Sequence, residues 1–310
     1  AVFSTFVEFN LRPWFYRFVF GAGRIDHFPL SNNSNPFLHQ CRDISHKKIK
    51  DFFGKKKLAN LISLSNRRPL NIINEMTTVE SYKPELNDLY RLYQFVLLNK
   101  RTTILEFGSG FSSLIFSQAL KENKNKYKND VKQLRRNNPF ELFIVENEKR
   151  FLNITKRRIA KFRSKKDTKK NKNKKSEVKI NFLFSECVMM NYRGNYATEY
   201  KKLPPCNPDF IYLDGPDQFK IKNKINNFTT AHQDMMPMAC DILKFENFLT
   251  PGTIIVSDGR SANCEFLLNN FKRQWIHHYD RKFDQHIFYL NSDTLGKYNE
   301  LQLKFYRHFN

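Results

Sequence analysis

Cysteine is scarce in this sequence, and the cysteines that are present form no recognisable pair. The 310 residues include five, Cys41, Cys187, Cys206, Cys240 and Cys264, an odd number without any C-x-x-C spacing. This pattern argues against a zinc site and against a disulfide framework. We therefore expect reduced, mostly buried thiols in a cytoplasmic protein.

The sequence also lacks a long uninterrupted apolar run. No segment approaches the roughly 18 apolar residues that are needed to span a bilayer. The aromatic stretch 1–20 is interrupted by Glu8, Arg12 and Arg17, and neither a basic start nor a small-residue cleavage site frames it. We therefore predict neither a transmembrane segment nor a signal peptide.

A third glycine is missing from the most informative motif of the chain. In the stretch 102–113, TTILEFGSGFSS, Gly108 and Gly110 stand between an apolar run and a helix-like run that Ser112 and Ser113 introduce. This predicts a strand, a tight turn and a helix, with glycines where the backbone bends and approaches a ligand. A dinucleotide-binding loop would have a glycine at position 113. The alternative is an ordinary glycine turn before a helix.

Glu106, two positions before the first glycine, indicates the charge of the ligand. A carboxylate beside a pyrophosphate is repelled, at a cost in electrostatic free energy. Beside an ammonium and a sulfonium the same carboxylate is attracted, with a gain of similar size. The loop therefore favours a cationic cofactor.

The net charge of +23, with a pI near 9.8, raises the expectation of a nucleic-acid or membrane partner. The charge is uneven, however, because the runs 121–137 and 161–175 supply more than half of the excess. Both include a connection from a helix to a strand, which in a doubly wound sheet lies at the amino ends of the strands. We expect them to lie away from the cofactor and to bind polyanions only incidentally.

Strand-like and helix-like runs alternate from residue 84 onward, which predicts one α/β doubly wound sheet. We expect strands within 140–147, 178–190, 208–218 and 252–258, two strands around a turn within 275–290, and helices within 84–100, 148–162, 234–249 and 260–271.

The segment E-F-G-S-G-F-S-S, followed by this order of elements, resembles the class I S-adenosylmethionine-dependent methyltransferases over about residues 84–291. The resemblance implies a mostly parallel seven-stranded sheet whose C-terminal strand is antiparallel, with S-adenosylmethionine as the cofactor. It also suggests three parts, which are an N-terminal accessory or lid region (1–80), a cofactor-binding methyltransferase domain (81–291) and a C-terminal tail (292–310).

Every predicted parallel strand ends in or beside an acidic residue. Each acid alone is consistent with a turn or a cap, but ligands of doubly wound sheets bind beyond the carboxyl ends of the strands. The five acids are Glu106, Glu146, Glu186, Asp214 and Asp258. Glu146 is placed to accept hydrogen bonds from ribose hydroxyls.

The resemblance extends to residue roles. It implies that Glu106 and the glycine-loop backbone face the methionine end of the cofactor, and that Glu186 lies near the adenine. The predicted cofactor-binding residues are Glu106, Gly108, Ser109, Gly110, Ser112, Glu146, Glu186 and Asp214.

Methyl transfer from a sulfonium needs an aligned acceptor and, for an alcohol, a group that removes a proton. The predicted catalytic residues are Asp214, Asp258 and His232, with Asp217 as a further base. Asp214 and Asp258 could alternatively hold Mg²⁺, as in the catechol-type O-methyltransferases. Gly259 stands where that group has an Asn ligand, so we assign no metal ligands and do not favour Mg²⁺.

The acceptor is expected to be a small molecule or a saccharide-like compound that is methylated on oxygen. One alternative is a nucleic-acid methyltransferase, although Asp214-Gly215-Pro216-Asp217 replaces the Asn- or Asp-Pro-Pro-aromatic motif of adenine-type enzymes, and Pro205-Cys206 precedes the strand. The other alternative is a non-catalytic nucleoside-binding protein of the same fold. The sequence leaves the oligomeric state open.

Overall fold

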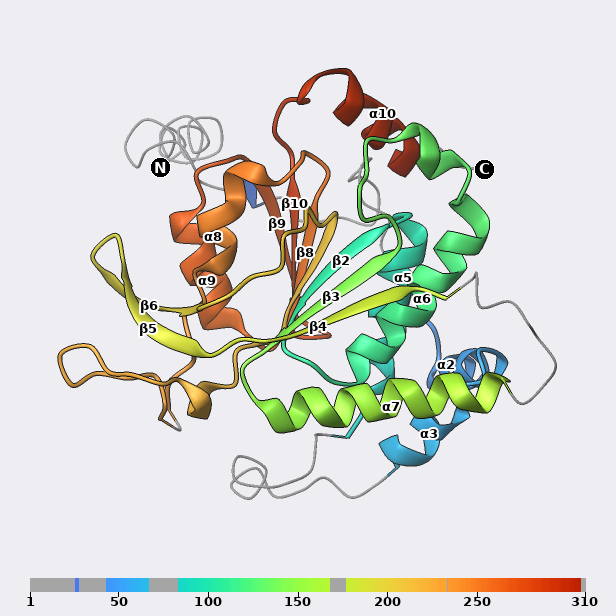
Figure 1. Cartoon of the computed structure of the whole chain (residues 1–310), viewed down its shortest axis with the longest axis horizontal. Helices are drawn as coiled ribbons and strands as arrows, with labels where there is room; N and C mark the ends of the chain where they lie inside the picture. Colours follow the sequence, from blue (N-terminus) through green and yellow to red (C-terminus); the bar gives the residue numbers. More distant parts are fainter. Residues whose placement is uncertain (1–25, 28–42, 67–82, 168–176, 233, 308–310) are drawn as a thin grey trace, which may run out of the picture.

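Apolar runs of the kind buried in parallel sheets form the centre of the molecule. The computed structural model describes residues 26–27, 43–66, 83–167, 177–232 and 234–307. In it, helices cover both faces of an eight-stranded sheet (Figure 1). The four middle strands are almost entirely buried: β2 (Thr103–Phe107), β3 (Glu141–Glu146), β7 (Phe210–Leu213) and β8 (Ile254–Asp258).

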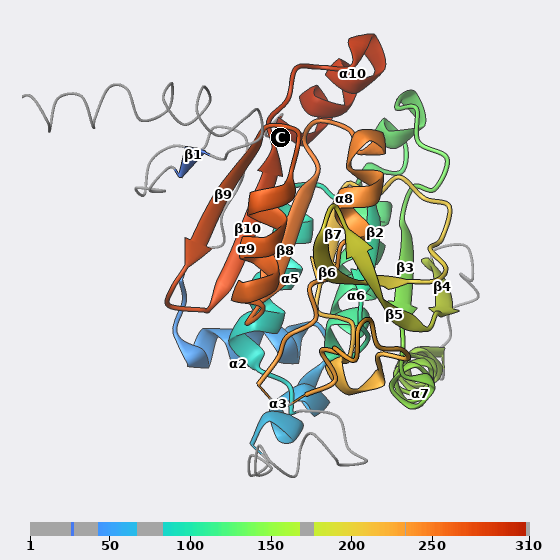
Figure 2. The ribbon, with the colours of Figure 1, turned by 90° about the vertical axis from the view of Figure 1, so that its left-hand side faces the viewer.

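The strand order is β1-β9-β10-β8-β7-β2-β3-β4. The outer strands are β4 (Lys179–Phe184), β9 (Trp275–Asp280) and β10 (Gln285–Leu290). β10 runs antiparallel to β8 and β9, whereas the other neighbours in this sheet are parallel. This order confirms the predicted class I methyltransferase-like fold. One strand of this sheet was not predicted, the two-residue β1 (Asp26–His27), which pairs with β9 at the edge of the sheet (Figure 2).

Two hydrophobic cores lie on opposite faces of the sheet. On one face α5 (Leu86–Leu98), α6 (Phe111–Tyr127) and α7 (Lys149–Asp167) pack against the strands. On the other face lie α8 (Asp241–Phe245) and α9 (Ser261–Asn270) (Figure 1). The helical spacing of apolar residues predicted in α5 is confirmed, because Leu86, Leu89, Leu92, Tyr93 and Val96 are all buried.

The connection between β4 and β7 differs from the prediction. The run 178–190, predicted as one strand, divides at Ser185-Glu186 into β4 and β5 (Cys187–Tyr192). β5 pairs with β6 (Asn195–Tyr200) in a separate hairpin, which turns at Arg193 and Gly194 with positive φ angles. This hairpin covers part of the sheet face where alternation of strands and helices would place a helix.

The C-terminal half has less helix in one place and more in another. The helix predicted over 234–249 is reduced to α8 and the 3₁₀ turn η4 (Glu246–Phe248). The tail predicted at 292–310 contains α10 (Gly296–Arg307), whose Leu303 and Tyr306 are buried. Two further 3₁₀ turns are η1 (Asp130–Gln133) and η3 (Gln218–Lys220).

Part of the predicted N-terminal accessory region is helical. α2 (His46–Lys55) and α3 (Ala59–Ser65) lie beside α5, and Ile49, Phe53 and Leu61 are buried in the same core. Most of the remaining residues of 1–80 lie outside the described residues, so the accessory or lid role stays a prediction.

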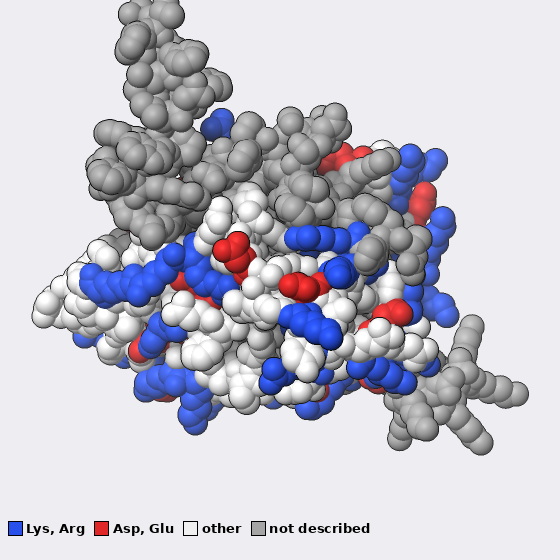
Figure 3. Space-filling model, turned by 90° about the horizontal axis from the view of Figure 1, so that it is seen from above, with Lys and Arg blue, Asp and Glu red and all other residues white. Residues whose placement is uncertain are grey.

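The described parts of the two basic runs lie on the side of the sheet that holds the amino ends of the parallel strands. Lys121 and Lys124 of α6 both bond to Glu177, shortly before β4 begins. Figure 3 shows the molecule from the end where α10 lies, with many Lys and Arg side chains and fewer acids on the described surface. Residues 168–176 lie outside the described residues. Of the helices that the structure describes, none has the length and apolar character needed to cross a membrane.

Candidate functional site

The glycine loop that follows β2 lies between the ends of β3 and β7. The Gly108 N–H donates to the Val145 carbonyl at 2.8 Å, and the Asp214 N–H donates to the Phe107 carbonyl at 2.9 Å. Gly108 has a φ of +96°, and a Cβ there would lie 3.0 Å from the carbonyl carbon of Asp214. Glycine is therefore required here by the backbone conformation and by the close approach of the two loops.

Gly110 differs from Gly108, because neither its backbone conformation nor a contact with the described residues requires glycine at this position. Its φ of −176° is extended backbone, and a Cβ would meet only the Ser112 hydroxyl, at 3.8 Å. The space in front of Gly110, where α6 begins, is therefore open. An open cradle at the start of a helix is suited to a ligand that approaches the backbone closely.

Glu106 is buried near the end of β2 and is only half satisfied by the protein. The Ser112 hydroxyl donates to its Oε1 at 2.5 Å, whereas Oε2 is buried without a hydrogen-bond partner among the residues described. Burial raises the pKa of this carboxyl to about 8, and the nearby hydroxyls of Ser112 and Ser113 oppose this shift. A buried oxygen without a donor fits a site where a ligand supplies a donor or a positive charge.

Glu146 ends the neighbouring strand β3 and is tied to the glycine loop. The Ser109 hydroxyl donates to Oε2 at 2.8 Å, and the Glu148 N–H donates to Oε1 at 2.9 Å. Burial raises its pKa to about 7 despite these two bonds. Each oxygen can accept a second hydrogen bond, so the arrangement is compatible with the predicted ribose contacts.

Asp214 follows β7 and, of the predicted bases, is placed closest to the glycine loop. Its side chain is exposed, yet the protein around it desolvates the carboxylate and raises its pKa to about 6. Arg260 opposes this shift, and its Nη2 donates to the Asp214 carbonyl at 2.7 Å and to the Pro216 carbonyl at 3.1 Å. Exposure leaves the carboxylate accessible to a ligand, and the raised pKa makes it a better proton acceptor. Asp214 is therefore suited to accept a proton from a ligand.

Asp258, at the end of β8, is held by the protein on both oxygens. The Tyr212 hydroxyl donates to Oδ2 and the Gln285 amide donates to Oδ1, both at 2.6 Å. Gln285 in turn accepts from Arg91 Nε at 3.0 Å. Asp258 is half-buried, and burial raises its pKa. These contacts are typical of a structural carboxylate.

Glu186 and His232 make no contact with Glu106, Glu146, Asp214 or Asp258 among the contacts of the described residues. Glu186 forms an ion pair with Lys201 at 2.8 Å on the surface. His232 lies exposed in the loop between β7 and α8, where its Nδ1 accepts from the Asp234 N–H at 3.1 Å. Their predicted roles, as an adenine contact and as a base, stay predictions. Asp217 caps η3 by accepting from the Phe219 N–H at 2.9 Å.

Tyr200 and Arg260 lie beside these residues but were not predicted. The buried Tyr200 hydroxyl has no hydrogen-bond partner in the described structure, and a Cβ on Gly215 would lie 2.5 Å from it. Its ring stacks on Phe107, with the ring centroids 5.5 Å apart. Arg260 had a detectable signal, because it comes two positions after a strand-end acid. Tyr200 had none, because the hairpin that carries it was not predicted.

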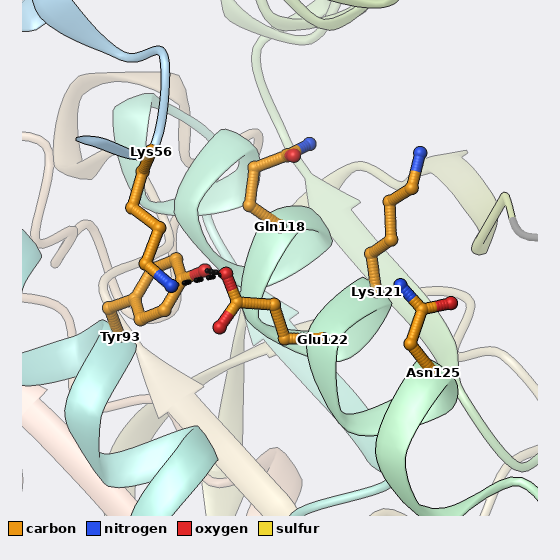
Figure 4. Close-up of a pocket in the computed structure, with 6 residues that line it drawn as sticks. All are labelled: Lys56, Tyr93, Gln118, Lys121, Glu122 and Asn125. Carbon is orange, nitrogen blue, oxygen red and sulfur yellow. Dashed lines mark hydrogen bonds and ion pairs between the residues drawn. The ribbon is translucent and has the colours of Figure 1, made fainter. Parts of the chain in front are cut away.

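A pocket of about 190 Å³ lies apart from these residues, between α2, α5 and α6 (Figure 4). Glu122 accepts from the Tyr93 hydroxyl at 2.6 Å and from Lys56 Nζ at 2.5 Å, so these charged groups satisfy one another. The pocket contains none of the predicted site residues. Within the described ranges, no group of three or more His, Cys, Asp or Glu side chains is arranged to hold a metal ion.

Comparisons with known proteins give matches in structure only. A scan against family models and a search of curated protein sequences give no match. The structure is similar to that of the SAH-bound methyltransferase PaMTH1 from Podospora anserina, with 10% identity and a TM-score of 0.36 over 82% of this chain and 100% of the other.

Two O-methyltransferases are similar as well. One is from Bacillus cereus in complex with SAH, at 12% identity and a TM-score of 0.33 over 80% of this chain and 92% of the other. The second is TomG from Streptomyces achromogenes, involved in tomaymycin synthesis and in complex with SAM, at 13% identity and a TM-score of 0.31 over 82% and 92%. At these identities and TM-scores, the strand order remains the basis for the fold and the contacts above remain the basis for the site.

Proposed function

We propose that this chain is an S-adenosylmethionine-dependent methyltransferase that acts on an oxygen of a small-molecule or saccharide-like acceptor. The observation that carries the proposal is the pair of buried carboxyls, Glu106 and Glu146, on either side of the glycine loop. Both have raised pKa values, and Glu106 keeps one oxygen without a donor. A cationic ligand with ribose hydroxyls supplies what these two groups need.

The residues fit the two ends of such a cofactor. Glu106, whose ionised form a bound cation favours, provides negative charge for an ammonium, and Glu146 provides acceptors for ribose hydroxyls. The open space at Gly110 lets the cofactor approach the start of α6. When bound, S-adenosylmethionine would supply an activated methyl group, so the protein has to align the acceptor and remove its proton.

Asp214 is the residue that we assign as the base. It is exposed beside the glycine loop, whereas both oxygens of Asp258 are already occupied by Tyr212 and Gln285. An acidic loop containing Gly215 and Pro216 suits a hydroxyl acceptor better than a flipped nucleobase. Lys121 and Lys124 lie near the start of β4, toward the opposite end of α6 from the glycine loop. Their positive charges are therefore not placed to hold a nucleic acid at the candidate site, which disfavours a nucleic-acid substrate.

Calorimetric titration with S-adenosylhomocysteine tests the cofactor assignment. We expect micromolar binding to the wild-type protein and a loss of about 10- to 100-fold in Glu146→Ala, the scale of a charge-assisted hydrogen bond. Binding without turnover on any hydroxyl acceptor would favour the non-catalytic alternative.

Activity that is lost in EDTA and restored by Mg²⁺ would establish a metal route, and insensitivity to EDTA would leave Asp214 or His232 as the base. The cytoplasmic location stays a prediction from the cysteines.

A further inference from the structure

Arg260 forms no ion pair with a carboxylate of the described residues, although its positive charge opposes the raised pKa of nearby Asp214. It directly precedes α9 (Ser261–Asn270), and its two hydrogen bonds run from Nη2 to the backbone carbonyls of Asp214 and Pro216. Its Nη1 is buried without a partner among the described residues. The ion pairs of the described residues do not include Arg260, whereas Arg91 forms an ion pair with Asp280 at 2.7 Å.

We propose that Arg260 binds the carboxylate of the amino-acid end of the cofactor. This inference rests on the proposed function, and it deepens it by assigning one residue to one chemical group of the ligand. A guanidinium is the side chain best suited to this task, because its planar N–H groups match the two oxygens of a carboxylate.

The charges around the glycine loop make such a residue necessary. The amino-acid end of S-adenosylmethionine carries an ammonium and a carboxylate, and the ionised Glu106 and the nearby Asp214 suit only the ammonium. Unopposed, they would repel the carboxylate. The ligand therefore needs a positive group beside the acids that recognise its ammonium.

Arg260 has the required location. Its guanidinium is hydrogen-bonded to the carbonyl of Asp214, and that same backbone segment is in contact with Gly108, where a Cβ would lie 3.1 Å from the Asp214 carbonyl oxygen. The arginine thus lies across one loop from the glycines that are predicted to face the methionine end. The bonds to Asp214 and Pro216 also fix the guanidinium before a ligand arrives, which lowers the entropic cost of binding.

The test compares two ligands that differ in the amino-acid end, which carries both the carboxylate and the ammonium. S-adenosylhomocysteine has the amino-acid end, whereas 5′-methylthioadenosine has the same nucleoside and sulfur without it. We expect Arg260→Gln to weaken S-adenosylhomocysteine by about 10- to 100-fold and to leave 5′-methylthioadenosine within about twofold of wild type. Arg260→Lys, which keeps the charge without the planar donors, should fall between the two.

Arg273→Gln is a matched control. Arg273 is also half-buried and also donates to two backbone carbonyls, those of Glu246 and Leu249, but it lies after α9 at the other end of the sheet. This control should bind both ligands like wild type.

Three results would overturn the inference. If Arg260→Gln weakens both ligands equally, Arg260 only supports the loop at Asp214. If it weakens neither but slows turnover, the arginine serves the acceptor instead of the cofactor. If the wild-type protein binds neither ligand, the proposed function fails as well. If wild type and Arg260→Gln bind S-adenosylhomocysteine equally well, only the role of Arg260 fails.

Discussion

A Cβ atom on Gly215 would lie 2.6 Å from the backbone nitrogen of Gly108. The loops after β2 and β7 therefore touch through two residues that have no side chain. This contact brings Asp214 beside the glycine loop and leaves Gly110, two residues further on, facing open space. The loop thus contains one glycine required for packing and one that is free to serve a ligand.

The first prediction concerns this packing contact. Gly215→Ala should lower the free energy of unfolding by about 1 to 3 kcal/mol, because the new methyl group meets backbone at Gly108 and the hydroxyl of Tyr200, and overpacking costs this much. Gly110→Ala is the control, since its Cβ meets nothing closer than 3.8 Å. Urea denaturation of both variants measures the difference. Equal stability of the two variants would contradict the contact.

The second prediction separates folding from binding at Gly110. Gly110→Val should keep a thermal unfolding midpoint near that of wild type but abolish calorimetric binding of S-adenosylhomocysteine, because the side chain fills the space in front of α6. A valine variant that binds normally would show that no ligand approaches the backbone there.

The third prediction concerns the Tyr200 hydroxyl, which is buried without a described partner. Tyr200→Phe removes an unsatisfied polar group, so the unliganded protein should be as stable as wild type or more stable by about 1 kcal/mol. If a ligand uses the hydroxyl, cofactor affinity should fall in the same variant. A loss of stability without ligand would mean that the hydroxyl is satisfied within the protein.

The sequence was enough to place Glu106, Gly108 and Glu146 at one edge of the sheet because their signals are local. Glu106, Gly108 and Glu146 lie at the ends of continuous apolar runs, and the sheet geometry brings such ends together. The alternation of elements predicted the doubly wound sheet, and the resemblance to class I methyltransferases implied its antiparallel C-terminal strand. Five acids at strand ends look alike in the sequence, however, and only the hydrogen bonds distinguish exposed Asp214 from Asp258, which Tyr212 and Gln285 hold.

The remainder depends on tertiary contacts that leave no local signal. The hairpin of β5 and β6 was missed because Ser185-Glu186 interrupts what reads as one apolar run, and this concealed Tyr200. β1 pairs with β9, and its two residues carry no periodicity of their own that could predict it. Short elements of this kind are determined by their neighbours and not by their own composition.

The fourth prediction is a dependence of stability on pH. Folded Glu106 holds its proton up to about pH 8, whereas the unfolded chain releases it near the ordinary value of 4.5. Between these values the folded state binds the extra proton, so the free energy of unfolding should fall as pH rises, by at most about 1.4 kcal/mol per pH unit. Glu146 adds to this fall up to about pH 7.

Glu106→Gln should therefore flatten the fall in stability between pH 7 and 8, as measured by urea denaturation across pH. Glu186→Gln is the control, because Glu186 lies on the surface, where its partner Lys201 lowers its pKa. An ammonium beside Glu106 favours the ionised carboxylate, so the affinity for S-adenosylhomocysteine, which carries this ammonium, should rise over the same interval. A stability that is flat with pH in wild type would contradict the raised pKa.

The last prediction distinguishes the two aspartates. Asp258→Asn should destabilise the fold by about 1 to 3 kcal/mol, because the new amide cannot accept from both Tyr212 and Gln285. Gln285 cannot reverse its amide to compensate, since its oxygen already accepts from Arg91. Adding Tyr212→Phe removes one of the two donors, so the double variant should lose less stability than the sum of the single variants.

Asp214→Asn should behave in the opposite way. Its side chain is exposed, so stability should stay within about 0.5 kcal/mol of wild type and cofactor affinity should change little. Turnover of a hydroxyl acceptor should drop by about 100-fold or more, the usual scale for loss of a general base. Full turnover in Asp214→Asn would rule out this residue as the base and leave exposed His232 as the predicted candidate, because both oxygens of Asp258 are engaged.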